Sequence, residues 1–365
     1  MLSPKPKEIC KYSSHGPYSG RTFQKYKLPP KVVSVLITAA NHSLAQGTFK
    51  SYKTAERHII RCEKDMKVKL RFPFGDKEVL TYIGWLVSTR KVSVKTVEKY
   101  LAGIRLAHLK EGHNVPVLRP EIVRIILNGL TQREKIQLRL EKKAERLPVT
   151  VSVLELIRHE LKKSHWPIEK KRMILTVCYI TFFGSFRIHE ILGKEKMTFD
   201  PQTTLLGNNL TIENWNEKNI KVMRIWLKSP KELRKGSGIM VEIFPTNNHL
   251  CPIRAYEKWR MVSKVAKTSM KPVFRQENGK NYTGQDFNAD LRKLLGKHLN
   301  YKEGKILSHS FRSGLATMMA QNGYSDEEIM RTGRWNSSAF LMYCKLGRVK
   351  RMAIAQELAS KITKM

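Results

Sequence analysis

Four short segments of the chain carry side chains that could act on a phosphate ester. FFGSFRIHEIL places Arg187 and Glu190 three residues apart, about one helical turn. LSHSFRSG places His309 and Arg312 at the same spacing. LKSPKELRKG is rich in lysine, and GRWNSSAFLMY ends at Tyr343. Alone, each segment has an ordinary structural explanation, such as a surface ion pair, a structural histidine, a solvated turn or a core tyrosine.

Together, these residue types suit a covalent reaction at phosphorus. An oxygen that attacks a phosphodiester adds negative charge to the non-bridging oxygens. Two planar guanidinium groups, Arg187 and Arg312, can hold that phosphate and stabilise the charge without a metal. A tyrosine has a pKa of about 10 and is protonated at neutral pH, so nearby positive charge is needed to favour its phenolate. A general acid for the leaving oxygen would add a factor of about 10²–10⁴ in rate.

The charge of the chain points to a polyanionic partner. Its 68 lysines and arginines face 31 acidic residues, which leaves a net charge of +37. Such a surplus repels itself unless a polyanion neutralises it, and nucleic acid does so with release of counterions. An acidic membrane is the competing partner, but no amphipathic N-terminal anchor, lipidation motif or membrane-spanning apolar run is present. We therefore expect an intracellular protein that binds nucleic acid and no membrane.

The cysteines argue against a metal or disulfide framework. The five cysteines are scattered and have no CxxC spacing. They are predicted to be free thiols in a reducing compartment. No metal and no cofactor are expected.

The first part of the chain is predicted to be a helical domain. Residues 1–27 are polar and expected to be loosely ordered, whereas residues 28–130 carry apolar residues at helical spacing in several segments. Residues 131–147 are rich in charge and Gln, which fits either a solvated helix face or a linker. Pro148 marks the change of domain, because proline disfavours helix in the residue before it.

A second domain is predicted over residues 148–347. It begins with helices, and Ile174–Phe183 is apolar enough to be a buried core helix. Three short β-branched or aromatic segments then predict antiparallel strands joined by hairpins: Leu210–Trp215, Val222–Leu227 and Ile239–Phe244. The lysine-rich segment lies in the turn before the last strand. The predicted fold class is mostly α (α+β), with a helical first domain followed by helices around a small three-stranded antiparallel sheet.

In this order, the four segments resemble the tyrosine recombinase (phage integrase) family, whose signature is Arg, Lys, His-x-x-Arg, His or Trp, and Tyr. The likeness is closest to the recombinases of eukaryotic DIRS-like and crypton mobile elements. Their turns look like LKSSK, here LKSPK, and their ends look like GRWxSSAFxxY. The resemblance covers Leu147–Gly347, and the first helices match the family's core-binding domain more loosely. The joint order of the motifs makes it specific.

The resemblance assigns roles to most of these residues. It implies that Tyr343 is the nucleophile and that His309 takes or relays its proton. Arg187 and Arg312 are implied to bind the phosphate. Glu190 is implied to orient Arg187 or His309 from behind.

Two roles stay open within the resemblance. The general acid aligns with Lys231, and Lys228 is the nearby alternative. The family's His or Trp position falls on Arg334 when counted back from Tyr343 without gaps, and Trp335 lies one residue further on. Either Arg334 donates to the phosphate or Trp335 packs against it, and we favour a buttressing role for Trp335.

The resemblance also implies a reaction and partners. The enzyme is expected to cleave double-stranded DNA, hold the end as a 3′-phosphotyrosine and rejoin it to another strand without metal or ATP. A homo-tetramer on two DNA sites, serving a mobile element in the nucleus, is the expected setting. The apolar residues of segment 348–365 fall on one face of a predicted helix, which is expected to pack either on its own domain or, as the resemblance suggests, on a neighbouring protomer. The alternatives are an inactive, domesticated DNA-binding protein of this fold and a type IB topoisomerase-like enzyme.

Overall fold

The structure, a computed structural model, divides the chain into two units, Met1–Lys143 and Ala144–Met365. It describes residues 18–43, 46–113, 121–140, 146–215, 220–228, 238–263, 269–298, 301 and 305–342. Each unit has a hydrophobic core of its own. Separate cores are the mark of separate domains.

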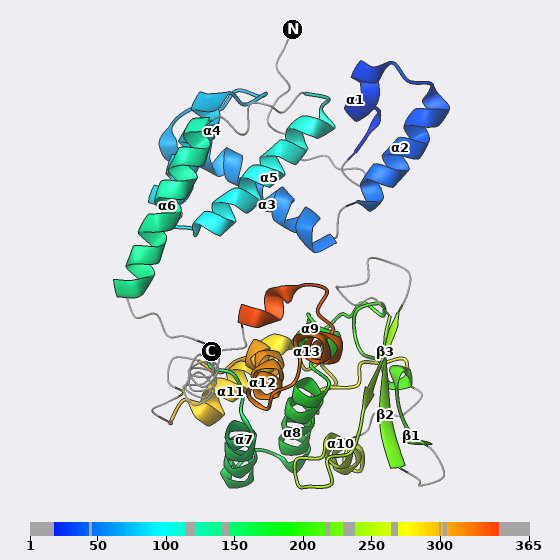
Figure 1. Ribbon diagram of the computed structural model, residues 1–365. Helices are drawn as coiled ribbons and strands as arrows, with labels where there is room; N and C mark the ends of the chain where they lie inside the picture. Colours follow the sequence, from blue (N-terminus) through cyan, green and yellow to red (C-terminus); the bar gives the residue numbers. More distant parts are fainter. Residues whose placement is uncertain are drawn as a thin grey trace, which may run out of the picture. The chain divides into compact units, whose positions relative to one another are not determined.

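The described part of the first unit is helical (Figure 1). Its longer helices are α2 (Pro30–His42), α3 (Gln46–Met66), α4 (Asp76–Ser88), α5 (Val94–Lys110) and α6 (Glu121–Leu140). Apolar residues recur at helical spacing along α3 to α6 and meet in one core around Tyr82, Trp85 and Ile104. The helical domain expected from the sequence is therefore present.

Two segments of this unit contain more helical structure than the simplest expectation from the sequence. Part of the segment expected to be loosely ordered forms α1 (Gly20–Phe23) and a 3-10 turn, η2 (Gln24–Tyr26). The hydroxyl of Thr22 donates to the Lys110 carbonyl, which ties this turn to the end of α5. The charged segment after residue 130 continues α6 as far as Leu140, which is the helical alternative for that stretch.

The second unit places a three-stranded antiparallel sheet beside a group of helices (Figure 1). The sheet order is β1 (Leu210–Trp215), β2 (Ile220–Leu227) and β3 (Ile239–Ile243), with Met223 opposite Ile243. The other elements are α7 (Val151–Lys163), α8 (Ile168–Phe183), α9 (Ile188–Ile191), η4 (Gly207–Asn209), α10 (Pro252–Arg260), α11 (Gly284–Leu295), α12 (Ser308–Gln321), α13 (Asp326–Gly333) and η6 (Ser338–Met342).

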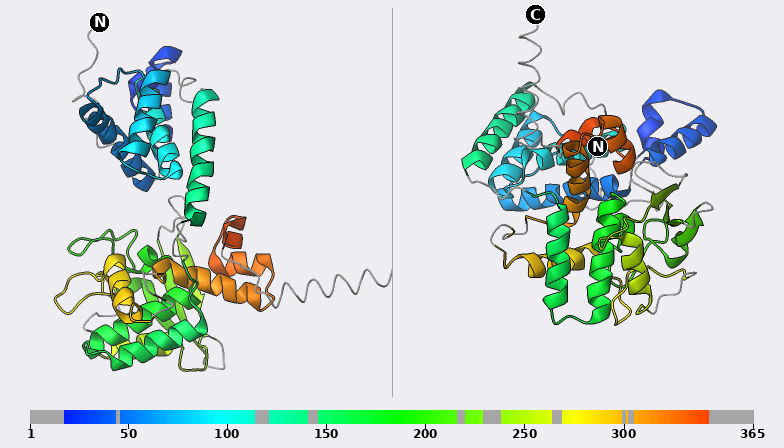
Figure 2. Two further views of the ribbon diagram at one scale, coloured as in Figure 1. Left: turned by 90° about the vertical axis from the view of Figure 1, so that its left-hand side faces the viewer. Right: turned by 60° about the horizontal axis from the view of Figure 1, so that its bottom comes forward.

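Helix α8 is the centre of this unit. Its residues are almost continuously buried from Met173 to Phe182, because the sequence there is apolar on every side. It packs against α7, α10 and α12, and α7 lies beside it in both views of Figure 2. The carboxyl end of α8 is therefore inside the unit, next to α12, and the chain that leaves it enters the candidate site.

These elements confirm the predicted fold class. The three strands lie where the sequence predicts them, except that β2 begins at Ile220 and β3 ends at Ile243. Within the described ranges, no helix is long and apolar enough to cross a membrane. The same residues hold no group of three His, Cys, Asp or Glu side chains placed to bind a metal ion.

Candidate functional site

The candidate site is built around the tight turn that follows α8. A Cβ added to Gly184 would lie 2.2 Å from the Phe186 ring, so only glycine lets that ring fold back into the core. Ser185 follows with φ of 48°, a left-handed conformation that costs a non-glycine residue about 1–2 kcal/mol. The backbone thus reverses, and the carbonyls of Gly184 and Ser185 become acceptors for arginines from distant segments.

Arg187 and Glu190 form an ion pair immediately after this turn. Arg187 is the N-cap of α9, and its backbone N–H donates to Glu190 Oε2 at 2.9 Å. Its Nη1 donates to Glu190 Oε1 at 3.1 Å. The Arg187 side chain keeps 29% of its surface exposed, whereas that of Glu190 keeps 10%. The pair suggested by the spacing is therefore formed, with its carboxylate buried and its guanidinium still reachable from solvent.

Arg312 lies deep in the unit on the first turns of α12. It is 1% exposed, and its Nη1 donates to the Ser185 carbonyl at 2.6 Å. Its guanidinium lies under the Trp335 ring, 4.6 Å from the ring centre, in a cation–π contact. The two arginines thus share one site but differ in access. Arg187 is accessible from solvent, whereas Arg312 is buried and in contact with Trp335.

The position of α12 is set by close backbone contact with the segment before α7. The N–H of Val149 donates to the Ser310 carbonyl at 2.9 Å. A Cβ at Gly314 would lie 2.1 Å from the Val149 carbonyl oxygen, so this approach requires glycine. The first turn of α12, which carries His309 and Arg312, is held in place by these contacts.

His309 is half-buried among positive charges. Burial lowers the pKa of its imidazole, and the charges of Arg146, Arg312 and Arg187 lower it further. The ring is therefore neutral at neutral pH and can accept a proton. His309 lies one turn before Arg312 on α12, and Arg312 binds the Ser185 carbonyl two residues before Arg187, so the structure gathers three of the predicted site residues.

Arg334 and Trp335 enter the same site from the end of α13. Arg334 is the C-cap, with φ of 54° in the left-handed region that usually takes glycine. Its side chain turns inward and donates to Gly184, Ser185 and Glu190. Trp335 folds back over Gly333, where an added Cβ would lie 1.5 Å from the indole. The arginine therefore binds the turn, and the tryptophan covers Arg312.

The other predicted residues are only partly described. Lys228 is half-buried just after β2 and lines a small hollow together with Glu190, Thr203 and Leu227. The predicted nucleophile Tyr343, the predicted general acid Lys231 and the segment 348–365 lie outside the described residues. Lys228 is thus near the ion pair, and the roles of Lys231 and Tyr343 stay predictions.

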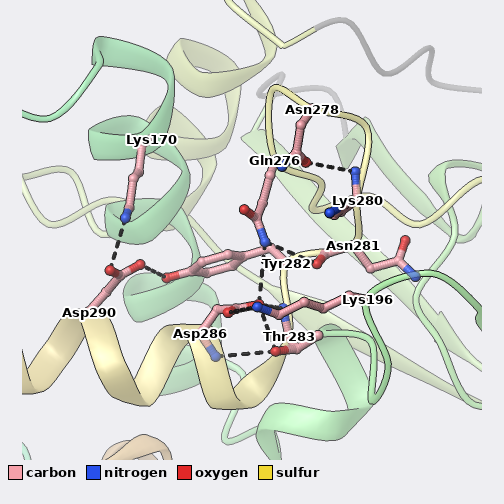
Figure 3. A network of polar contacts seen from close by, with 10 residues as sticks. All are labelled: Lys170, Lys196, Gln276, Asn278, Lys280, Asn281, Tyr282, Thr283, Asp286 and Asp290. Carbon is pink, nitrogen blue, oxygen red and sulfur yellow. Dashed lines mark hydrogen bonds and ion pairs between the residues drawn. The ribbon is translucent and has the colours of Figure 1, made fainter.

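Sequence reasoning missed a polar network that holds the segment after α9 (Figure 3). The side chain of Asn281 is buried and donates to the carbonyls of Glu195 and Thr198, both at 3.0 Å. Asp286, in the first turn of α11, pairs with Lys196 at 3.1 Å. Thr283 and Asp286 form a capping box, and their Thr-x-x-Asp spacing is the one sequence signal of this network.

The same network reaches the opposite end of α8. Asp290 is buried and accepts from the Tyr282 hydroxyl at 2.8 Å and from Lys170 at 2.9 Å (Figure 3). A Cβ at Gly284 would lie 3.2 Å from Ile188, so α11 also packs directly on α9. Helix α11 therefore fixes both the start of α8 and the element that carries the Arg187–Glu190 pair.

A second basic region lies on the first unit. Arg57 and Arg61 are exposed on α3, and Arg90 is close enough that all three charges lower the pKa of His58, after the effect of burial. His58 packs edge-on against Trp85 and Tyr100. His58 thus packs on aromatic side chains beside three arginines, of which Arg57 and Arg61 are exposed and Arg90 is partly buried.

Comparisons with known proteins bear on the fold. No protein-family model matches the sequence, and no curated protein matches it at the significance required. Among solved structures, a fragment of the Tn1549 transposon integrase that carries one substitution, in complex with a circular intermediate DNA, has a TM-score of 0.52 and 12% identity, and the match covers 86% of this chain and 94% of that fragment. The XerH site-specific recombinase, in a post-cleavage complex with palindromic difH DNA, has a TM-score of 0.51 and 12% identity. That match covers 96% of this chain and 92% of XerH.

Identities this low establish the architecture alone. The overall fold of both matched structures is similar to that of this chain, which is mostly helical with a small three-stranded antiparallel sheet in its second unit. The observation agrees with the resemblance found in the sequence, which rests on separate features. The chain shares the overall fold of these integrase and recombinase structures.

Proposed function

We propose that this protein is a tyrosine recombinase that cleaves and rejoins double-stranded DNA. The observation that carries the proposal is the meeting of Arg187, His309 and Arg312 in one site of a chain with this fold: Arg312 binds the Ser185 carbonyl two residues before Arg187, and His309 lies on the same first turns of α12 as Arg312. These groups come from two segments more than a hundred residues apart, and their types suit a phosphate under attack by an oxygen. A structural role for any one of them alone does not explain their convergence.

In the proposed reaction, the Tyr343 oxygen attacks the scissile phosphorus and His309 accepts the phenolic proton. A phosphorus–tyrosine bond forms, and the bond from phosphorus to the 5′ oxygen of the next nucleotide breaks. That oxygen takes a proton from Lys231, or from Lys228 as the alternative. Because the phosphotyrosine keeps the energy of the broken bond, a 5′ hydroxyl of another strand reverses the step and completes the exchange.

Binding to DNA is supported by the charge of the chain and by the fold. Neutralising phosphates with lysine and arginine releases counterions, and a chain of net charge +37 has a large capacity for this. The exposed arginines of α3 provide one basic surface for it. The two matched structures are DNA complexes. We extend the proposal to a homo-tetramer on two DNA sites, serving a mobile element in the nucleus.

The decisive test is covalent trapping of DNA. Purified protein is incubated with fragmented DNA, denatured, and the DNA that stays attached is sequenced to find the target. On a nicked duplex built from that target, wild-type protein should form an adduct that resists denaturation. Tyr343→Phe should bind the duplex with unchanged affinity and form no adduct, because it lacks the attacking oxygen.

The alternatives are distinguished by this experiment together with an assay of supercoil relaxation. DNA affinity without an adduct on any target would point to an inactive DNA-binding protein and overturn the proposal. Relaxation of supercoiled DNA without sequence preference or strand exchange would point to a type IB topoisomerase-like enzyme. An adduct in Tyr343→Phe would mean that another residue is the nucleophile.

A further inference from the structure

Arg334 makes contacts that join three parts of the second unit. Its Nη1 donates to the Gly184 carbonyl at 2.7 Å, and its Nη2 donates to the Ser185 carbonyl at 3.2 Å. The same Nη2 lies 3.0 Å from Glu190 Oε2. The side chain is 10% exposed, and its guanidinium stacks on Phe186 at 4.7 Å. Its Nη1 and Nη2 groups therefore donate to acceptors inside the protein.

Its acceptors are the groups that hold the other two arginines. The Ser185 carbonyl also receives the Nη1 of Arg312, and Glu190 also receives the Nη1 of Arg187. The backbone carbonyl of Arg334 accepts from Arg312 Nη2 at 3.4 Å, so this residue contacts Arg312 directly as well. One side chain thus connects the acceptors of both proposed phosphate-binding groups.

The backbone at these contacts is held in costly conformations. Ser185 and Arg334 both lie in the left-handed region, with φ of 48° and 54°. Such residues persist only where the surroundings determine them, and they gather at sites where geometry serves function. The guanidinium of Arg334 donates to the Ser185 carbonyl and so links these two left-handed residues. Lysine carries its three donors on one nitrogen and has no planar fork, so it cannot reproduce contacts made by two separate nitrogens, Nη1 and Nη2, in a fixed geometry.

We propose that Arg334 is a positioning residue, which fixes the Gly184–Ser185 turn and Glu190 and thereby sets the places of Arg312 and Arg187. It does not bind the scissile phosphate itself. The inference rests on the proposed function, since it concerns the placement of the same site. Arg334 would thus have a positioning role at the sequence position where the tyrosine recombinase pattern has His or Trp.

The test uses Arg334→Lys, because this variant keeps the charge and removes the fork. Arg331→Lys is the matched control: it lies on the same helix, and its one described ion pair, with Glu327, is on the surface. Single-turnover cleavage at saturating DNA is measured together with DNA affinity. A displacement of about 1 Å at a reacting site costs about 10²-fold in rate, so we expect a loss of that order in Arg334→Lys with unchanged affinity. Arg331→Lys should match the wild type.

A double-mutant cycle distinguishes positioning from direct phosphate contact. If Arg334 acts through Arg312, then Arg334→Lys adds little to the loss caused by Arg312→Lys, because the coupled residues fail together. Independent contact with the phosphate would instead multiply the two losses. Multiplied losses, or full activity of Arg334→Lys, would overturn the proposal.

A second readout needs no DNA and therefore stands apart from the proposed function. The charge of Arg312 is one cause of the lowered pKa of His309, so movement of Arg312 changes that pKa. NMR titration of the His309 ring, assigned with His309→Gln, should show a changed pKa in Arg334→Lys and the wild-type pKa in Arg331→Lys. If Arg334→Lys does not fold, Glu190→Gln weakens the same junction from its acceptor side and should shift the His309 pKa. An unchanged pKa in every folded variant would refute the positioning role.

Discussion

Replacing Gly333 with alanine should displace Trp335 from its place over Arg312. The added Cβ would lie 1.5 Å from the indole, whereas carbon atoms in contact are separated by about 3.5–4 Å. The ring must therefore move by about 2 Å or force α13 to shift. Gly333 is buried at the end of this helix and its φ is not in the left-handed region, so the backbone itself tolerates alanine.

The expected loss of stability follows from three terms. Overpacking a buried position costs about 1–3 kcal/mol. Weakening the Arg312–Trp335 contact adds about 0.5–2 kcal/mol, because the pair is desolvated. The higher helix propensity of alanine offsets about 1 kcal/mol of this. We expect a net loss of about 2 kcal/mol, which lowers the unfolding temperature of a unit of this size by roughly 4–8 °C.

Thermal unfolding followed by tryptophan fluorescence measures this effect. Gly129→Ala is the matched control, because it is the same change within helix α6 with no atom within 4 Å of the added Cβ. That variant should be more stable than the wild type by about 0.5–1 kcal/mol. Gly333→Ala should also cleave DNA more slowly. Wild-type stability and cleavage in Gly333→Ala would show that Trp335 is not held against Gly333 and would refute the buttressing argument.

Three further predictions concern proton transfer, binding and the supporting network. Because the pKa of His309 is lowered in the folded protein, its ring is neutral above that pKa, and cleavage should slow as the pH drops through it. His309→Gln should lower the cleavage rate by about 10²–10⁴-fold. An unchanged acidic limb in the pH–rate profile of that variant would contradict the role of His309 as proton acceptor. DNA affinity, measured by fluorescence anisotropy, should fall by about 10³–10⁵ between 50 and 200 mM salt if about 6–10 phosphates are contacted, and a flat response would contradict the charge argument. Asn281→Ala should destabilise the second unit by about 1–3 kcal/mol in urea unfolding, since the buried Asn281 side chain makes two hydrogen bonds that are each worth about 0.5–1.5 kcal/mol, whereas the exposed Asn278→Ala should have a smaller effect.

The sequence predicted the elements of the fold well because their signals are local. The apolar run of α8 and the three strands each depend on residues within a few positions of one another. The Arg187–Glu190 ion pair also follows from spacing, although the structure makes Arg187 the N-cap and not a residue within the helix. Local rules apply to such features wherever the segment lies in the molecule.

The contacts of Arg334 and Trp335 could not be predicted in this way. Counting back from Tyr343 left two candidates for one position, and no local rule separates a side chain that faces a phosphate from one that turns inward. The acceptors of Arg334 lie 144 to 150 residues away in the sequence. The hydrogen bonds of Asn281 could not be predicted from local rules either, because its acceptors lie 83 and 86 residues away in the sequence.

The amino-acid sequence by itself determined which chemical groups are available, their order and the charge that favours a polyanion. It also determined the helices and strands, since side-chain periodicity and turn residues act over short distances. Only the tertiary structure decided that Arg312 lies under Trp335, that Arg187 keeps access to solvent and that Arg334 binds the turn after α8. The physical reason is that these outcomes depend on close packing between segments far apart in the chain, where small differences in shape select one arrangement.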